Sequence, residues 1–116
     1  MDNARVFKMP FASVYPHYLT KALKKGRTAS EVDEVICWLT GYTARTLAKQ
    51  IEQKVDLATF FQQAPALHAN ANKITGTICG VRIEAIDDPL MQKIRYMDKL
   101  VDELAKGRLM AKILRA

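Results

Sequence analysis

The segment that decides the fold runs from Gly26 to Tyr42 and reads G-R-T-A-S-E-V-D-E-V-I-C-W-L-T-G-Y. It holds the signals of a complete short helix over residues 29–40. Thr28 can cap the first turn, and Glu31 can reach back to it, which is the spacing of a capping box. Gly41 can take the left-handed conformation that ends a helix. One apolar stripe has the spacing i, i+3, i+4 and i+7, and it consists of Val32, Val35, Ile36 and Leu39.

Three further helices are predicted in the first 65 residues, over about 14–25, over about 44–54, and in a short segment after position 56. Ser13, Thr43 and Asp56 are the residues expected to cap them. Pro65 prevents the last of them from continuing. The side chains expected to face the core are Tyr15, Leu19, Ala22 and Leu23 in the first, Ala44, Leu47, Ala48 and Ile51 in the second, and Leu57, Phe60, Phe61 and Ala64 in the third.

The last third of the chain carries a long helix over residues 88–106. Asp88 is placed to cap it, and Pro89 occupies its first position. Apolar residues then follow at spacings of 4, 3, 4 and 3, and they are Leu90, Ile94, Met97, Val101 and Leu104. Such a heptad seam packs along another helix. We expect it to cross the earlier helices, and residues 90–104 also offer a route to a homo-oligomer. Residues 108–115 continue as a last basic helical turn or two.

Two segments do not show a clear helical pattern. Residues 1–12 are predicted to form an extended arm because Pro10 resists a helix. Residues 74–86 combine β-branched residues and two glycines, which favour a strand, with a helical stripe of apolar positions. We predict a short helix followed by an extended piece there. Residues 66–72, just before the second of these segments, show no hydrophobic periodicity and are expected to form a loop.

Length and composition indicate a single domain over residues 1–116. The chain has a mass of 13.1 kDa, is 49% hydrophobic and is 26% charged, which is ordinary for a globular protein. We therefore predict an all-α, compact domain of five or six helices. No apolar run approaches the roughly 20 residues that cross a bilayer, and the first residues lack the apolar centre of a secretory signal. We expect a cytoplasmic protein without a membrane partner.

The net charge of +6 is spread unevenly. The first 30 residues hold six basic residues and one acid, whereas residues 31–70 hold five acids and three basic residues. A basic segment can steer a protein toward nucleic acid or an acidic partner. Lys24 and Lys25 also precede Gly26 directly, where positive charge simply favours the end of a helix.

No set of residues has the spacing of a catalytic or metal site. His17 and His68 have no ligand-spaced neighbour, and Cys37 and Cys79 lie 42 positions apart without the paired spacing of a zinc site. The acidic clusters at 31–34 and 84–88 fall at helix starts, where negative charge is stabilising. We therefore predict no catalytic, metal-binding or cofactor-binding residue, and we favour a protein that is not an enzyme.

A helix-turn-helix is the sharpest functional alternative. Two short helices are joined by T-G-Y-T at 40–43, and the second would present only Arg45, Lys49 and Gln53. The pattern falters because Thr40 and Gln50 would occupy its buried positions. The surrounding segment is also acidic, which is the wrong sign for phosphate contacts. Trp38 lies at the edge of the apolar stripe, as a core boundary or as an interface anchor.

Several strings in the chain resemble a bacterial family catalogued as a domain of unknown function, number twenty-two hundred in that series. They are A-S-V-Y-P (12–16), K-K-G-R-T (24–28), E-V-D-E-V-I (31–36), W-L-T-G-Y (38–42), T-G-T-I-C-G (75–80) and D-P-L-M-Q-K-I-R-Y-M-D-K-L-V-D-E-L-A-K-G (88–107). The resemblance extends from about Phe7 to Arg115. It implies a small, free-standing, cytoplasmic prokaryotic protein, and it brings no catalytic or ligand-binding residue.

The sequence thus favours a non-enzymatic protein-interaction or ligand-binding module, with a helix-turn-helix-like nucleic-acid-binding protein as the alternative. A homo-oligomer or another protein is the expected partner, and nucleic acid is the alternative one. The predicted interaction surface consists of Trp38, Tyr42, Arg45, Lys49, Lys24, Lys25 and Arg27.

Overall fold

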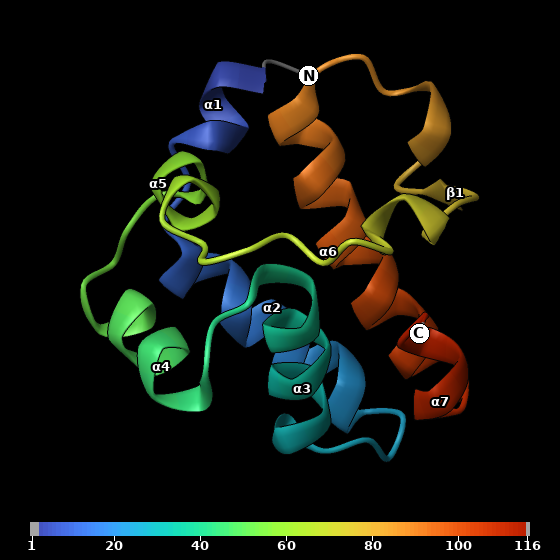
Figure 1. Ribbon diagram of the computed structural model, residues 1–116. Helices are drawn as coiled ribbons and strands as arrows, with labels where there is room; N and C mark the ends of the chain where they lie inside the picture. Colours follow the sequence, from blue (N-terminus) through green and yellow to red (C-terminus); the bar gives the residue numbers. More distant parts are fainter. Residues whose placement is uncertain (1–2, 116) are drawn as a thin grey trace.

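A computed structural model describes residues 3–115, in which a long helix, α6 (Pro89–Ala105), lies at the centre (Figure 1). It packs against α2, α3, α5, α7 and the first strand of a small hairpin. The remaining elements, in chain order, are α1 (Asn3–Phe7), α2 (Phe11–Leu23), α3 (Ala29–Thr40), α4 (Ala44–Glu52), α5 (Leu57–Gln62), the 3-10 turn η1 (Ala71–Lys73), β1 (Thr77–Ile78), β2 (Val81–Arg82), the 3-10 turn η2 (Ile83–Ala85) and α7 (Met110–Ile113). The predicted all-α class is confirmed. The described residues form seven α-helices instead of the predicted five or six, and α1 is the helix that was not expected.

Helix α3 begins and ends as predicted. The Thr28 hydroxyl accepts a hydrogen bond from the Glu31 amide at 3.1 Å, and the Thr28 amide donates to the Glu31 carboxylate at 3.0 Å. Gly41 ends the helix with φ of 81°, and its amide donates to the Cys37 carbonyl at 2.9 Å. The four residues of the apolar stripe are fully buried. Local signals alone therefore fix this helix and the face it buries.

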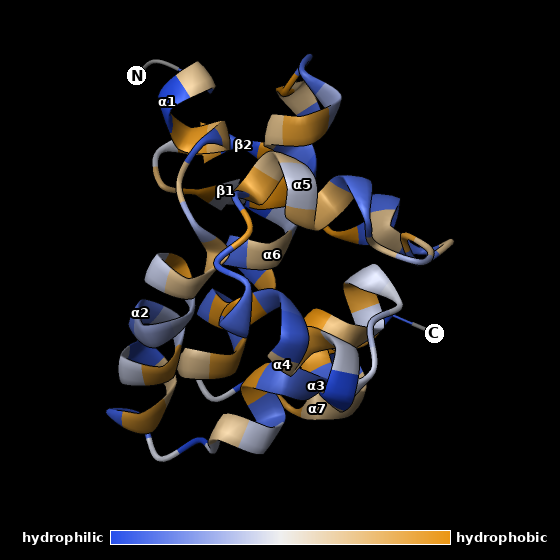
Figure 2. Cartoon of the chain, turned by 90° about the vertical axis from the view of Figure 1, so that its left-hand side faces the viewer, coloured by the Kyte–Doolittle hydropathy of each residue, from blue (hydrophilic) through white to orange (hydrophobic). Residues whose placement is uncertain are grey.

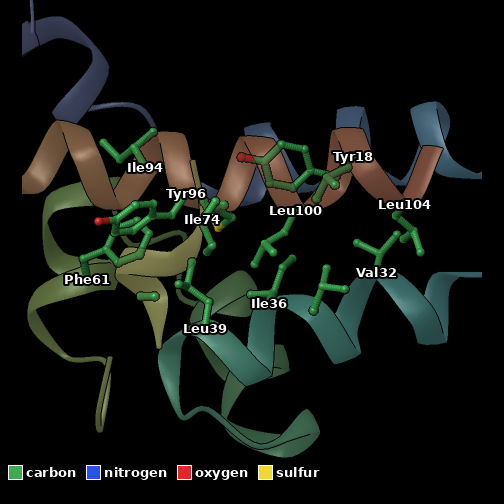
Figure 3. Close-up of a cluster of buried hydrophobic side chains, with 14 of the residues drawn as sticks. Tyr18, Val32, Ile36, Leu39, Phe61, Ile74, Ile94, Tyr96, Leu100 and Leu104 are labelled. Carbon is green, nitrogen blue, oxygen red and sulfur yellow. The ribbon is translucent and has the colours of Figure 1, made fainter. Parts of the chain in front are cut away.

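The seam of α6 is buried inside the same chain. The Asp88 carboxylate caps the helix by accepting from the Met91 amide at 3.0 Å, as predicted. Val32, Ile36 and Leu39 of α3 point toward Leu100 and Leu104 of α6 (Figure 3). The seam residues from 94 to 104 are at most 3% exposed. The earlier helices therefore cover these side chains.

The prediction of an extended arm over 1–12 is wrong for its described part, because residues 3–7 form α1 and α2 already begins at Phe11. Pro10 precedes α2 with φ of −64° and ψ of 136°, so it starts the helix instead of preventing it. Phe11 is fully buried and stacks on Phe60 at 4.0 Å between ring centroids. Residues 1 and 2 of the predicted arm lie outside the described residues, as does residue 116.

The buried face of α2 also differs from the prediction. Its buried residues are Phe11, Tyr18 and Ala22, whereas the side chain of Leu23, expected in the core, is 56% exposed. Ser13 lies inside the helix and does not cap it. Two backbone hydrogen bonds hold the start of α2 beside the α4–α5 connection: the Phe11 amide donates to the Val55 carbonyl at 2.8 Å, and the Leu57 amide donates to the Met9 carbonyl at 2.9 Å. These contacts fix the rotation of α2 that brings Tyr18 to α6.

Helix α4 buries a different face from the one predicted. Leu47 and Gln50 are buried, Ile51 is half-buried, and the two alanines at 44 and 48 are exposed. The amide nitrogen of Gln50 donates to the Gln63 side chain at 3.2 Å, whereas its Oε1 is buried and has no partner among residues 3–115. Thr40 is fully buried as well, and its hydroxyl donates to the Ile36 carbonyl at 2.8 Å. Polar residues thus lie where the apolar pattern predicted none, Thr40 with a local hydrogen bond and Gln50 with one from a more distant residue.

Residues 74–86 form neither the predicted helix nor a lone extended piece. They fold into an antiparallel hairpin in which Thr77 pairs with Arg82 and Ile78 pairs with Val81, followed by η2. The two turn residues, Cys79 and Gly80, have φ of 53° and 75°. Two positive φ values are what a two-residue hairpin turn requires. The strand finds its partner within the same segment.

The helices close around one core. The radius of gyration is 13.1 Å, close to the value of about 13 Å expected for a compact chain of roughly this length. Figure 2 shows that most helices carry both hydrophobic and hydrophilic residues, as helices around a core do. Among residues 3–115, no helix combines the length and the apolar character that crossing a bilayer would need.

Candidate ligand-binding groove

A buried polar cluster joins α2 to α6. The Tyr18 hydroxyl donates to Oδ1 of Asp98 at 2.5 Å, and Nη1 of Arg95 donates to Oδ2 of the same carboxylate at 2.9 Å. The side chains of Arg95 and Asp98 are 13% and 17% exposed, and Tyr18 is 7% exposed. The i, i+3 spacing places Arg95 and Asp98 on one side of α6. We call these three residues the polar cluster.

The hydrogen bonds leave one member of the polar cluster incompletely paired. Both carboxylate oxygens of Asp98 accept a hydrogen bond. Burial, and then the Asp98 carboxylate, raises the pKa of the Tyr18 hydroxyl well above its ordinary value, so Tyr18 stays a donor. Nε of Arg95 is buried and finds no acceptor among residues 3–115, where Nη2 makes no hydrogen bond either. An unpaired buried donor costs about 1–3 kcal/mol.

Three cavities adjoin the polar cluster, and Arg95 lines all of them. Their volumes are about 250, 400 and 310 Å³. We call them together the groove. The first cavity lies among α1, α2, α5 and α6, the second lies beside the hairpin and η2, and the third lies between α2, the hairpin tip and α6. The apolar residues of the first cavity are Val6, Met9, Val14, Leu57 and Ile94.

The hairpin forms the wall of the groove opposite α2. Cys79, at its tip, lines the second and third cavities and is exposed. Nζ of Lys99 donates to the Thr77 carbonyl at 3.1 Å, and the Gly76 amide donates to Oε2 of Glu84 at 3.0 Å. A non-glycine residue with positive φ is uncommon, and such conformations persist where surrounding contacts hold them. The hairpin tip is thus a positioned element.

The aromatic residues of the predicted interaction surface do not form a free surface. Trp38 is half-buried, and His68 stacks on it at 4.1 Å between ring centroids. Tyr42 is 5% exposed, and its hydroxyl donates to the Phe60 carbonyl at 2.5 Å. Burial raises the pKa of Tyr42 to about 12. Tyr42 belongs to the core, and Trp38 seals its boundary.

The basic residues of that surface lie in separate places. Arg45 and Lys49 are exposed on α4, whereas Lys24 and Lys25 follow the end of α2. These two regions connect to opposite ends of α3, whose 12 residues span about 18 Å. The guanidinium of Arg27 is engaged elsewhere, because it donates to the Glu31 carboxylate at 2.8 Å and to the Arg108 carbonyl at 2.8 Å.

Comparison with known proteins places the chain in a family. The sequence model of a family described as "Uncharacterized protein conserved in bacteria (DUF2200)" matches residues 5–115. The chain belongs to the DUF2200 family. The crystal structure of "uncharacterized protein SP1917" is similar to this DUF2200 member, with a TM-score of 0.92 and 46% sequence identity over 98% of this chain and 93% of that chain. No curated protein matches the chain.

The histidines and cysteines of this DUF2200 member separate into two groups. His17 lines the first and third cavities of the groove, and Cys79 lines the second and third. Cys37 lies on α3, outside the groove, and is half-buried. Its burial, and to a lesser degree the charge of Asp33, raises the pKa of its thiol. His68 covers Trp38, and its Nδ1 accepts from the Asn70 amide at 3.0 Å. Of these four residues, only His17 and Cys79 line the groove.

Sequence reasoning missed the polar cluster in this DUF2200 protein. Tyr18 and Asp98 are 80 positions apart, so no local pattern connects them. Tyr18 was also outside the face of α2 expected to be buried. The only local signal was the i, i+3 pair of Arg95 and Asp98 beside the apolar seam, and such pairs are usually exposed and weak.

Proposed function

We propose that this protein is a small-molecule-binding module whose ligand occupies the groove between α2, α6 and the hairpin. The observation that carries the proposal is the position of Arg95. Its side chain is only 13% exposed, Asp98 accepts a hydrogen bond from its Nη1 at 2.9 Å, and the residue lines all three cavities. Ligand sites characteristically combine apolar walls with a few fixed polar groups.

The chemistry of the groove supports binding over catalysis. A tyrosine that acts as a base or nucleophile needs a lowered pKa, whereas the pKa of Tyr18 is raised. The Asp98 carboxylate is held between two donors and is therefore a poor general base. These side chains hold Arg95 in place, which is a positioning role.

The volume of the first cavity supports a ligand with a small apolar body. An apolar cavity of about 150 Å³ holds one benzene ring. The first cavity measures about 250 Å³ and has five aliphatic or thioether side chains in its wall. A body of about the size of a bicyclic ring fits this space, and the larger second and third cavities leave room for polar substituents.

Titration of the ¹⁵N-labelled protein with 3-methylindole, a neutral bicyclic probe, tests the proposal. We expect saturable amide shifts that centre on Val14, Leu57 and Ile94. Val14→Trp fills the first cavity and should weaken binding by at least about tenfold, which corresponds to about 1.4 kcal/mol. Leu109→Trp makes the same kind of addition at a position that is 70% exposed and outside the groove, so it should leave binding unchanged.

Two results would overturn the proposal. One is the absence of saturable shifts in the natural protein up to the solubility limit of the probe. The other is equal binding by the Val14→Trp and Leu109→Trp proteins. If Val14→Trp does not give the spectrum of a folded protein, Met9→Trp replaces it, because Met9 also lines the first cavity and is 42% exposed.

A further inference from the structure

We infer that the protein binds the phosphate backbone of a nucleic-acid duplex at one end of the molecule, where the ends of α2 and α6 meet α7. The basic residues of this end are called the basic end, and they are Lys24, Lys25, Arg27, Lys106, Arg108 and Lys112. The inference goes beyond the proposed function and does not depend on a ligand in the groove. It follows from the distribution of charge, from the contacts that join two distant segments, and from the exposure of their basic side chains.

Almost all of the net charge lies in two segments of the chain. Residues 21–31 and 102–115 together hold eight basic residues and three acids, which leaves +5 of the total of +6. Residues 32–101 hold eight basic residues and eight acids, so they are neutral. The isoelectric point of the chain is about 9.5. A high isoelectric point with the basic residues clustered in one region is the electrostatic pattern of a nucleic-acid-binding protein.

The fold brings these two segments to the same end of the molecule. Nζ of Lys21 and Nζ of Lys106 lie 2.9 and 3.0 Å from the two carboxylate oxygens of Asp102, which joins the end of α2 to the end of α6. Nη1 of Arg27 donates to the Arg108 carbonyl at 2.8 Å, which joins the connection after α2 to the connection before α7. Both ribbon views show the α2–α3 connection and α7 at one end (Figures 1 and 2).

The two acids of α6 hold basic side chains in place without covering them. The side chains of Asp102 and Glu103 are 12% and 6% exposed, so their charges lie largely below the surface. Lys106, paired with Asp102, has a side chain that is 72% exposed. Arg108, paired with Glu103 at 3.0 Å, has a side chain that is 49% exposed. The positive ends of these pairs therefore face the solvent.

Three lysines of the basic end add charge that no acid balances. Lys24, Lys25 and Lys112 are exposed, and none of them has an ion pair within residues 3–115. Positive charge at the end of α2 or α7 favours each helix by itself. That effect does not require the ends of three helices to meet, whereas a polyanion gains from every cation gathered at one place.

The composition of the basic end selects a duplex among the anionic partners. Residues 21–31 and 102–115 contain no aromatic residue, and single strands are held by bases that stack on aromatic side chains. Leu23 and Leu109, at 56% and 70% exposed, are too few to form the apolar centre of a protein interface. Lysine binds phosphate as a point charge, and duplex DNA carries one such charge per roughly 1.7 Å of its axis.

Fluorescence anisotropy with a labelled DNA duplex of about 20 base pairs tests the inference. We expect the natural protein to bind, and the logarithm of the association constant to fall linearly with the logarithm of the salt concentration between about 50 and 200 mM. Three to five phosphate contacts correspond to a slope of about −3 to −5, since each contact contributes about −0.9. The same strand without its complement should bind more weakly and with a smaller slope.

Two triple variants with the same change in net charge locate the contacts. The first replaces the unpaired lysines of the basic end by glutamine, as Lys24→Gln, Lys25→Gln and Lys112→Gln. It should reduce the magnitude of the salt slope by about 2 to 3 and weaken binding at least about tenfold at low salt. The control neutralises three exposed basic residues of α4 and the turn after it, as Arg45→Gln, Lys49→Gln and Lys54→Gln, and it should keep the slope and bind within about threefold.

Three results would overturn the inference. The first is no change in anisotropy at about 50 mM salt with the natural protein. The second is an equal loss of binding in the two triple variants. The third is equal affinity for poly-L-glutamate of matched charge, which would assign the basic end to an acidic protein instead. If the first variant does not fold, amide shifts of the natural protein with the duplex decide: they should centre on residues 24–27 and 106–112, and a centre on α4 would contradict the inference.

Discussion

Replacement of Gly41 by Ala tests how the chain ends α3 and begins its turn toward α4. Gly41 has φ of 81°, and a left-handed conformation costs a residue with a Cβ about 1–2 kcal/mol. A Cβ at this position would also lie 2.9 Å from the nitrogen and 3.0 Å from the oxygen of Ala66. Relief of that clash must displace the Ala66 amide, which donates to the Thr40 carbonyl at 3.1 Å. Loss of that hydrogen bond adds about 1–3 kcal/mol.

The matched control is Gly26→Ala at the start of the same segment. Gly26 has φ of 79°, and no atom lies within 4 Å of the position that a Cβ would occupy. Alanine at this position therefore carries the conformational cost without the clash. Urea unfolding should show that Gly41→Ala loses about 1–3 kcal/mol more than Gly26→Ala. The difference in melting temperature should be roughly 4–12 °C for a chain of this size. Equal losses in the two variants would refute the argument that the 66–68 loop packs against the end of α3.

The remaining predictions concern pH. Burial raises the pKa of all four tyrosines, to about 12 for Tyr42, so native stability should hold below about pH 10 and decline as the pH rises toward those native values. Tyrosinate absorbance near pH 10 should therefore remain low until the protein unfolds, and half-ionisation of native protein at that pH would contradict this. Burial opposes the ionisation of Asp102, but hydrogen bonds from Lys21 and Lys106 lower its pKa overall, so its stabilising effect should be present above about pH 4 and be lost as the pH falls further. Between about pH 4 and pH 2, the urea midpoint should fall less in Asp102→Asn than in the natural protein. An equal fall of the midpoint in both proteins would count against the ion pairs.

Elements with strong local signals could be predicted from the sequence. The capping box of Thr28 and Glu31, the left-handed Gly41 and the buried stripe of α3 all follow from spacing along the chain. The Asp88 cap and the seam of α6 could be predicted from the sequence in the same way. In these helices the local preference and the tertiary packing agree, which is why pattern reasoning succeeds.

Elements whose conformation depends on distant contacts could not be predicted. Pro10 starts α2 because backbone hydrogen bonds to the segment around 55–57 hold its neighbours. The hairpin turn uses Cys79 before Gly80, where Asn or Asp would have been the recognisable signal. Gln50 is buried because Gln63, 13 positions away, offers it an acceptor.

The groove could not be predicted from the sequence for the same reason. The groove needs the face of α2 that presents Tyr18, the i, i+3 pair on α6 and the hairpin wall. The buried face of α2 and the hairpin were both predicted incorrectly. His17 was identified in the sequence as a residue without partners, yet it lines two of the three cavities. A site made by the packing of three elements has no signature in any one of them.

A crystal structure of the protein grown with 3-methylindole would show whether the groove is a ligand site. We expect the indole ring in the first cavity, in contact with Val14, Leu57 and Ile94 and beside Arg95. An unoccupied first cavity, with the compound bound at another surface under conditions that saturate the amide shifts, would contradict it.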